Sequence, residues 1–217
     1  MNTLEPLTMP KLSAEQWAER ERSIKAAEKA EQRRKVLERL DHSGIPRIYR
    51  SYDLSQCDEA VQDAYKAIRS GLSVGYVFQG KVGRGKTVSA CCCLLEHLKT
   101  ALGRFATMQR ILEDIRGTYS GQGNEGETLS RYRNTKLLVI DDLGKEKPSE
   151  FALSKLFEII DYRISNGLPT IITTQYRGAE LIERLGACGE AATAEAIVSR
   201  LATFNRLTFA GEDRRLS

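Results

Sequence analysis

The feature that most constrains the fold is the glycine-rich segment at residues 80–87, which reads GKVGRGKT. It matches the pattern G-x-x-x-x-G-K-[ST] in full. A strand-like run at residues 75–79 precedes it, and a helix-like stretch at 86–99 follows it. In such a turn the glycines let backbone N–H groups point inward around phosphates, and the helix N-terminus adds partial positive charge. The segment therefore predicts a phosphate-binding loop in a nucleoside-triphosphatase rather than a chance glycine-rich turn.

The residues of this loop have distinct expected roles. Lys86 is expected to reach the β- and γ-phosphates of ATP, and the Thr87 hydroxyl is expected to ligate Mg²⁺. The predicted nucleotide-binding residues of the loop are Gly80, Lys81, Val82, Gly83, Arg84, Gly85, Lys86, Thr87 and Val88.

A pair of acidic residues provides a second predicted anchor for the metal. Residues 137–140 form an unbroken apolar run, as in a strand buried on both faces, and Asp141 and Asp142 follow directly. We expect Asp141 to hold Mg²⁺ through water and Asp142 to polarise the attacking water. Two acids that merely end a strand are the alternative, which the phosphate loop disfavours. The division of roles within the pair stays open.

A third polar position ends another apolar run, at residues 169–173. If that strand neighbours the strand before the phosphate loop, Thr174 or Gln175 lies beside the γ-phosphate. Either side chain could orient the attacking water, and a strand that simply ends in polar residues explains the pattern about as well.

Strands that alternate with helices predict an α/β fold with a central parallel sheet. A glycine-rich stretch at residues 117–126 is expected to be a mobile loop. The predicted strands lie at residues 75–79, 104–107, 137–140, 169–173 and 205–209, and the helices at 86–99, 109–116 and 149–165.

The N-terminal region predicts a separate solvated helix. Residues 13–40 contain no Gly or Pro, and Ser13 with Gln16 has the spacing of a capping box. Its apolar positions are sparse and keep no heptad, which argues against a coiled coil. A helix-breaking stretch at residues 42–46 divides the chain into an N-terminal helical segment, residues 1–44, and an ATPase domain, residues 45–217.

Composition excludes several classes of protein. The 33 basic and 29 acidic residues leave a charge of +4, which permits nucleic-acid contact without demanding it. Three of the five cysteines are consecutive, a spacing that suits buried thiols better than disulfides or a metal clamp. The sequence shows no secretion signal and no apolar run of membrane-spanning length, so we expect a cytoplasmic protein without membrane contact.

The order of these motifs resembles the AAA+ ATPases of the DnaC/IstB group, which are replicative-helicase loaders and their transposition relatives. The resemblance covers residues 44–216, and the run DDLGKEKP at residues 141–148 is specific to the group. It implies the three-layer AAA+ core, with Asp141 and Asp142 as the Walker B acids and the polar strand end as sensor 1. Because the group usually has Asn where this chain has Gln175, both Thr174 and Gln175 remain candidates.

The resemblance also implies self-assembly with shared ATP sites. Arg200 matches the arginine finger that completes a neighbour's site, where it neutralises charge on the γ-phosphoryl oxygens. Arg214 or Arg215 matches a sensor-2 arginine, although the same residues could form a terminal turn.

Residues 109–133 fall where loaders and initiators of this clade carry a helical insertion that contacts single-stranded DNA. Arginine pairs with phosphates and tyrosine stacks on bases, although a solvated basic face explains the composition nearly as well. The candidate contacts are Arg110, Arg116, Tyr119, Arg131, Tyr132 and Arg133.

The favoured function is an ATP-dependent replication factor that engages a hexameric replicative helicase and single-stranded DNA. The helix around Trp17 is the expected helicase-binding element. One alternative is an IstB-like ATPase that regulates a transposase on duplex DNA. Another is a binding adaptor that ATP switches with little turnover.

Overall fold

The computed structural model describes residues 13–120, 123–211 and 213, which form two units. The units divide between Glu38 and Arg39, a few residues before the boundary expected at 44. Ser43 is fully buried, and its carbonyl accepts a hydrogen bond from the Phe105 amide, so the residues just before 45 pack with the second unit.

Helix α1, Ala14–Asp41, makes up the described part of the first unit and continues into the second. It begins with the predicted capping box: the Gln16 amide N–H donates to Ser13 Oγ, and the Ser13 amide N–H donates to Gln16 Oε1. None of its residues is buried, and Trp17 is 54% exposed. The predicted solvated helix is therefore confirmed.

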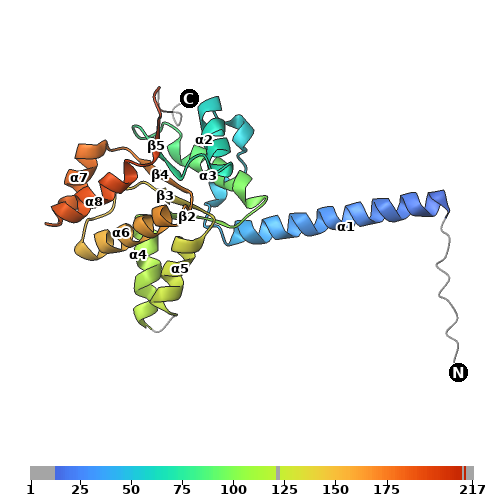
Figure 1. Cartoon of the computed structure of the whole chain (residues 1–217), viewed down its shortest axis with the longest axis horizontal. Helices are drawn as coiled ribbons and strands as arrows, with labels where there is room; N and C mark the ends of the chain where they lie inside the picture. Colours follow the sequence, from blue (N-terminus) through green and yellow to red (C-terminus); the bar gives the residue numbers. More distant parts are fainter. Residues whose placement is uncertain (1–12, 121–122, 212, 214–217) are drawn as a thin grey trace. The chain divides into compact units, whose positions relative to one another are not determined.

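The second unit is built on a five-stranded sheet in which every pairing is parallel, in the order β2-β3-β4-β1-β5 (Figure 1). The strand that carries the polar end, β4, lies between β3 and β1, so it does neighbour the strand before the phosphate loop. The strands are β1 Gly75–Gln79, β2 Gly103–Thr107, β3 Leu137–Asp141, β4 Thr170–Thr174 and β5 Asn205–Thr208.

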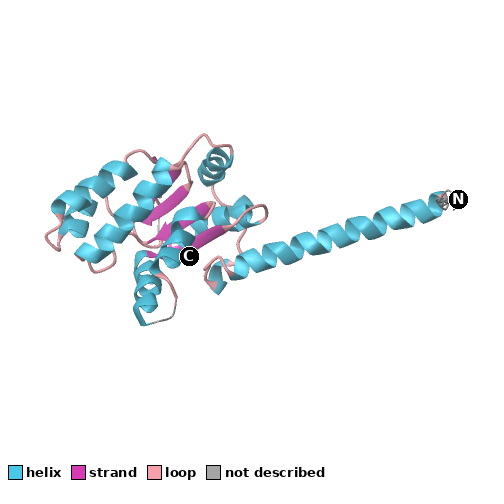
Figure 2. Cartoon of the chain, turned by 60° about the horizontal axis from the view of Figure 1, so that its bottom comes forward, coloured by secondary structure: helices cyan, strands magenta, loops and turns pink. Residues whose placement is uncertain are grey.

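Helices cover both faces of the sheet (Figure 2). Because successive side chains of a strand point to opposite faces, one strand can contribute to an apolar cluster on each face. In β3, Leu137 and Val139 pack in one apolar cluster, whereas Leu138 and Ile140 pack in the other. The first cluster includes side chains of α2, Glu59–Arg69, and α3, Lys86–Leu98. The second includes side chains of α4 Met108–Gly117, α5 Glu125–Asn134, α6 Glu150–Ser165, α7 Gly178–Gly186 and α8 Ala191–Leu201. The predicted three-layer α/β fold is confirmed.

The prediction of a loop at residues 117–126 is wrong over most of that range. Gly117 still belongs to α4, Thr118–Ser120 forms a 3-10 turn, and α5 begins at Glu125. Asn124 caps α5, because its side-chain oxygen accepts hydrogen bonds from two amide groups of the first turn. A helix N-cap therefore outweighs the glycine content that predicted a loop, and residues 121–122 lie outside the described part.

A fully buried arginine, Arg163 of α6, ties the end of α5 to the start of β4. Its guanidinium donates to the carbonyls of Tyr132, Arg133, Thr135 and Pro169 and to the Thr170 hydroxyl, at 2.5–3.0 Å. Burial lowers the pKa of this guanidinium, because desolvation disfavours its charged form. The hydrogen bonds compensate for this desolvation, because they satisfy backbone carbonyls that would otherwise be buried without a partner.

The described residues contain two further 3-10 turns, η1 Arg47–Tyr49 and η2 Leu54–Gln56, which connect α1 to α2. All five cysteines are free, and the consecutive three are buried in α3, as expected for small core side chains. Within the described segments, no helix combines the length and apolarity needed to cross a membrane.

We expect Arg163→Met to lower the free energy of unfolding by about 3 kcal/mol or more, since several buried carbonyls would lose their donor. Urea denaturation followed by circular dichroism measures the change. Arg131→Met, on the exposed face of α5, is the matched control and should stay near wild type. Equal stability of the two variants would show that the Arg163 hydrogen bonds contribute nothing net.

Candidate nucleotide-binding site

The phosphate loop leaves β1 at Gly80 and enters α3 at Lys86. Gly83 and Gly85 have φ angles of 79° and 86°, in the left-handed region where a side chain would be strained. Gly85 is the N-cap residue of α3, so the loop ends directly on a helix N-terminus. The backbone that the sequence predicted for phosphate binding is therefore present.

A cavity of about 560 Å³ opens at this loop. The loop and α3 form one wall, the segment that contains η1 and η2 forms another, and two residues after β3 complete it. The lining residues are Val82, Gly83, Arg84, Gly85, Lys86, Thr87, Val88, Ser89, Cys92, Ile48, Tyr49, Tyr52, Gln56, Cys57, Asp142 and Lys145. Of the predicted loop residues, Gly80 and Lys81 do not line the cavity.

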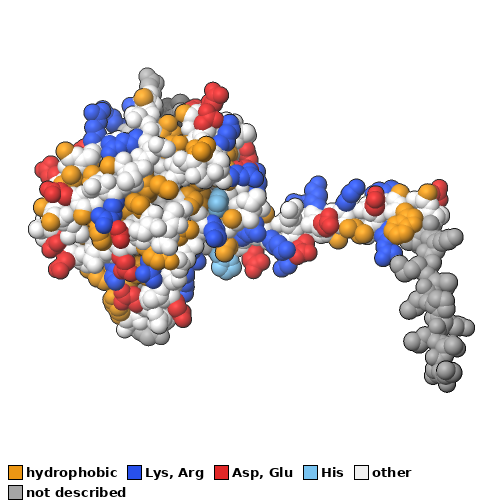
Figure 3. Space-filling view, in the orientation of Figure 1, with side chains coloured by type: hydrophobic (Ala, Val, Ile, Leu, Met, Phe, Trp, Pro, Cys, Tyr) orange, Lys and Arg blue, Asp and Glu red, His pale blue; other side chains and the backbone are white. Residues whose placement is uncertain are grey.

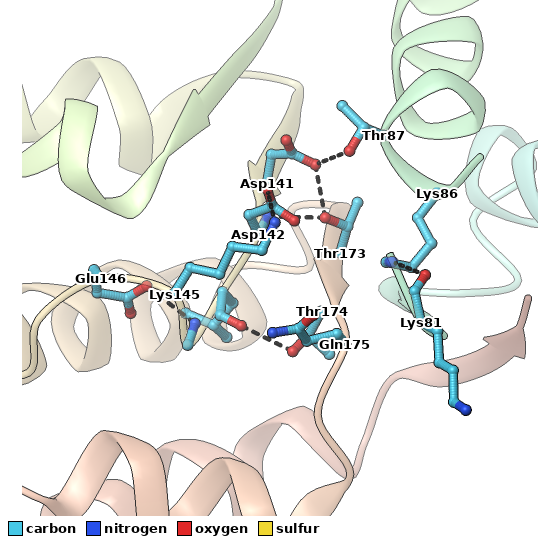
Figure 4. Close-up of polar contacts among 12 residues, drawn as sticks. Lys81, Lys86, Thr87, Asp141, Asp142, Lys145, Glu146, Thr173, Thr174 and Gln175 are labelled. Carbon is cyan, nitrogen blue, oxygen red and sulfur yellow. Dashed lines mark hydrogen bonds and ion pairs between the residues drawn. The ribbon is translucent and has the colours of Figure 1, made fainter. Parts of the chain in front are cut away.

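The Lys86 side chain is buried and folds back over its own loop (Figure 4). Its ammonium group donates a hydrogen bond to the Lys81 carbonyl at 2.8 Å. A phosphate oxygen bound at the loop would likewise accept a hydrogen bond from this ammonium group.

Thr87 and Asp141, which lie far apart in the sequence, meet at the end of β3 (Figure 4). The Thr87 hydroxyl donates to Asp141 Oδ1 at 2.9 Å. Burial is the main cause that raises the pKa of the Asp141 carboxyl, and a nearby divalent cation would offset that cost. A hydroxyl and a carboxylate are oxygen donors, which are the ligands that Mg²⁺ prefers. The pair therefore fits the predicted metal.

Thr173 of β4 is a site residue that sequence reasoning missed. Its hydroxyl donates to Asp141 Oδ1 at 2.6 Å and accepts a hydrogen bond from the Asp142 amide N–H at 2.9 Å. It therefore fixes both acids at once. No sequence signal singled it out, because its place depends on strand register: Ile140 pairs with Ile172 across parallel strands, so the next residues, Asp141 and Thr173, also face each other.

The two predicted sensor residues point elsewhere. The Thr174 hydroxyl donates to the Leu143 carbonyl at 2.8 Å and accepts from the Tyr176 amide at 3.2 Å. The Gln175 amide donates to the Tyr176 hydroxyl. Neither side chain lines the cavity. Thr173 is the residue of β4 whose side chain contacts the acid pair.

Lys145 is the second site residue that the sequence did not single out. Its ammonium group lies 2.6 Å from Asp142 Oδ2, and both residues line the cavity. The spacing permits this contact, because a turn with a glycine at its third position brings its fourth residue back toward its first, but the positive φ of Asp142 is set by the fold.

Arg200 of α8 does not line the cavity of its own chain. Its Nε donates to Asp161 Oδ1 of α6 at 2.6 Å, and its guanidinium carbon lies 4.2 Å from the centre of the Phe157 ring. Its side chain remains 34% exposed. Arg214 and Arg215 lie outside the described residues.

Tyr132 cannot serve as the predicted base-stacking residue, which corrects its assignment. It is 3% exposed, and its hydroxyl donates to Asp114. Helical spacing on α5 turns it into the core, where it packs with the second apolar cluster.

The arginines of the same segment are partly engaged within the protein. Arg110 pairs with Asp114 at 2.8 Å, and Arg133 pairs with Glu158 at 3.0 Å. Figure 3 shows basic side chains interspersed with acidic ones on the face of the unit that it presents. Four of the candidate contacts are exposed on this segment, namely Arg110, Arg116, Tyr119 and Arg131.

We expect Lys86→Ala to weaken ATP binding at least a hundredfold, because it removes the charged donor nearest the phosphate loop. Isothermal calorimetry with a non-hydrolysable ATP analogue measures the loss. Lys99→Ala, at the far end of α3, is the control and should bind normally. Unchanged affinity in Lys86→Ala would refute the phosphate-loop assignment.

Comparisons with solved structures agree with the fold. DnaI superposes with a TM-score of 0.66 and 21% identity, over 77% of this chain and 96% of that one. The DnaC helicase loader gives a TM-score of 0.60 and 25% identity, over 76% and 100% of the two chains. DnaA from Aquifex aeolicus, bound to AMPPCP, gives 0.59 and 16%, over 76% and 52%.

Sequence comparisons give the family. The replicative helicase loader DnaC of Escherichia coli K12 is 26% identical over 185 residues, which cover 78% of this chain and 75% of the relative. An insertion-sequence protein of Mycobacterium tuberculosis, described as ATP-binding, is 30% identical over 114 residues, or 51% and 43% of the two chains. The family model for IstB-like ATP binding proteins matches residues 24–216, so the chain belongs to that family.

Proposed function

We propose that the chain is a Mg²⁺-dependent ATPase that binds single-stranded DNA and loads a replicative helicase in the cytoplasm. The observation that carries the ATPase part is the meeting of the phosphate loop with the Thr87–Asp141 pair at one edge of the sheet. The similarity to the E. coli helicase loader over most of the chain supports the loading part.

The residues of the site divide the work of hydrolysis. Lys86 and the loop amides hold the phosphates, while Thr87 and Asp141 would hold Mg²⁺, which neutralises the phosphate charge when bound. Through its hydroxyl, Thr173 holds the Asp141 carboxylate and the backbone amide of Asp142. Asp142, at the cavity wall, accepts a hydrogen bond from the attacking water.

A second protomer would complete the site through Arg200. The partly exposed guanidinium is held by Asp161 and Phe157 on the surface of α6, away from the cavity of its own chain. An arginine that is ordered in this way on a surface can enter a neighbour's site with little further loss of side-chain freedom. Hydrolysis would then wait on self-assembly.

The partner surfaces are proposed on exposed residues. Trp17 on α1 belongs to a unit that is separate from the ATPase core, and we assign the helicase contact to it. Arg110, Arg116, Tyr119 and Arg131, in the segment that contains α4 and α5, are the exposed candidates for single-stranded DNA.

A transposition ATPase on duplex DNA is the second candidate, and the insertion-sequence relative favours it. An adaptor that ATP switches with little turnover is the third. Phosphate release measured with no DNA, with single-stranded DNA and with duplex DNA separates the three. A loader should respond to single strands, a transposition ATPase to duplex, and an adaptor to neither.

We expect the full chain to co-purify with the replicative helicase of its own host, and Trp17→Ala to reduce that capture about tenfold or more, since large aromatic residues dominate interfaces. Leu72→Ala is the control, because Leu72 is an exposed apolar residue of the ATPase unit. The ATPase rate should stay unchanged in both variants. Failure of the wild-type chain to bind the helicase would contradict the loader assignment.

Arg200→Ala protomers should bind ATP normally but hydrolyse it roughly a thousandfold more slowly, the contribution that arginine fingers make. Asp142→Asn protomers should also bind ATP and turn over slowly. Mixtures of the two should regain part of the activity, because some interfaces then join an intact acid pair to an intact arginine. No recovery at any ratio, with assembly verified by light scattering, would leave a monomeric ATPase as the better account.

A further inference from the structure

Lys145 is a charged residue of the cavity that the proposed mechanism does not use. It lines the same cavity as Lys86 and Thr87 and forms an ion pair of 2.6 Å with Asp142 Oδ2. The ammonium thus contacts the carboxylate to which we assign the attacking water.

A turn after β3 produces this pairing. The Lys145 amide donates to the Asp142 carbonyl at 3.2 Å, which closes a turn with Gly144 at its third position and a φ of 92°. Asp142 has a φ of 57° and is the one residue other than glycine with positive φ in the described part of the chain. Such a conformation persists where surrounding contacts impose it, and it is common at functional sites.

Those contacts fix the backbone of the turn. The Leu143 amide donates to the Thr173 carbonyl at 2.9 Å, and the Leu143 carbonyl accepts from Thr174 Oγ1 at 2.8 Å. The Gly144 carbonyl accepts from Arg184 Nε at 3.0 Å. The origin of the Lys145 side chain is therefore held at the cavity wall, and the flexible four-carbon side chain remains to move the charge.

We propose that Lys145 is a second phosphate-binding lysine and that its movement to the terminal phosphate of ATP releases Asp142. In the arrangement seen here, the ammonium contacts the carboxylate oxygen Oδ2. With a triphosphate in the cavity, the ammonium transfers to a γ-phosphate oxygen, and the carboxylate becomes free to accept a proton. This inference rests on the proposed ATPase function and adds a control of the same site.

The energetics favour such an exchange. The side chains of Lys145 and Asp142 are 42% and 32% exposed, and ion pairs at that exposure are weak because water screens them. A terminal phosphate carries more negative charge than a carboxylate and accepts charged hydrogen bonds strongly. ADP has no γ-phosphate, so Lys145 would stay on Asp142 when ADP is bound.

The chemical step balances with the residues at hand. The oxygen of the attacking water bonds to the γ-phosphorus, and the bond from that phosphorus to the β–γ bridging oxygen breaks. ADP leaves with the bonding electron pair. The water proton passes to the carboxylate that Lys145 has released. After the phosphate departs, the ammonium returns to Asp142, which then loses its proton to solvent.

The decisive measurement compares the affinities for a non-hydrolysable ATP analogue and for ADP by calorimetry. Lys145→Met should weaken binding of the analogue roughly tenfold, the usual effect of one charged hydrogen bond, and leave ADP within about twofold. Lys145→Arg should restore part of the preference for the analogue. Lys147→Met, an exposed lysine of the same loop outside the cavity lining, is the matched control and should change neither affinity.

A second variant tests the exchange itself. Asp142→Asn removes the competing carboxylate, so it should strengthen binding of the analogue a few-fold in the wild-type background but not in Lys145→Met. Equal changes for the analogue and ADP, or no change for either, would overturn the inference. Binding of neither nucleotide by the wild-type chain would instead overturn the proposed ATPase function.

Discussion

The parallel pairing of β3, β4 and β1 is the constraint on which the candidate site depends. Because these strands run in the same direction, their carboxyl ends lie at one edge of the sheet, where the phosphate loop, the acid pair and Thr173 all emerge. The Thr173 hydroxyl then links the acids, since it donates to Asp141 and accepts from the Asp142 amide. A shift of one residue in the pairing would turn these side chains to opposite faces.

The three cations to which we assign phosphate contacts have internal partners, and those partners indicate how the site could respond to a nucleotide. Lys86 contacts a carbonyl of its own loop, Lys145 contacts Asp142, and Arg200 contacts Asp161. Each contact is local, and those of Lys145 and Arg200 are partly exposed. Exposed ion pairs contribute little stability, so exchange for phosphate oxygens would disturb the fold little. Arg163 is the contrasting case, because its buried hydrogen bonds join three elements and leave no room for exchange.

The segment of α4 and α5 shows how far composition alone can mislead. Its arginines and tyrosines suggested a surface for single-stranded DNA, yet Tyr132 lies in the core and Arg133 pairs with Glu158. The helical phase decides which side chains face outward, and the phase depends on where the helix begins. Asn124 sets that start by capping α5, within a stretch whose glycines had predicted a loop.

The sequence by itself determined the phosphate loop, the acid pair, the alternation of strands and helices, and the capped N-terminal helix. Each of these depends on local patterns: spacing of glycines, apolar runs and a capping pair. Only the tertiary structure decided that Thr173 rather than Thr174 faces the acids, and that Lys145 reaches Asp142. Those facts depend on the register between separate strands and on a positive φ at a residue other than glycine, which packing around the turn imposes and no local pattern encodes.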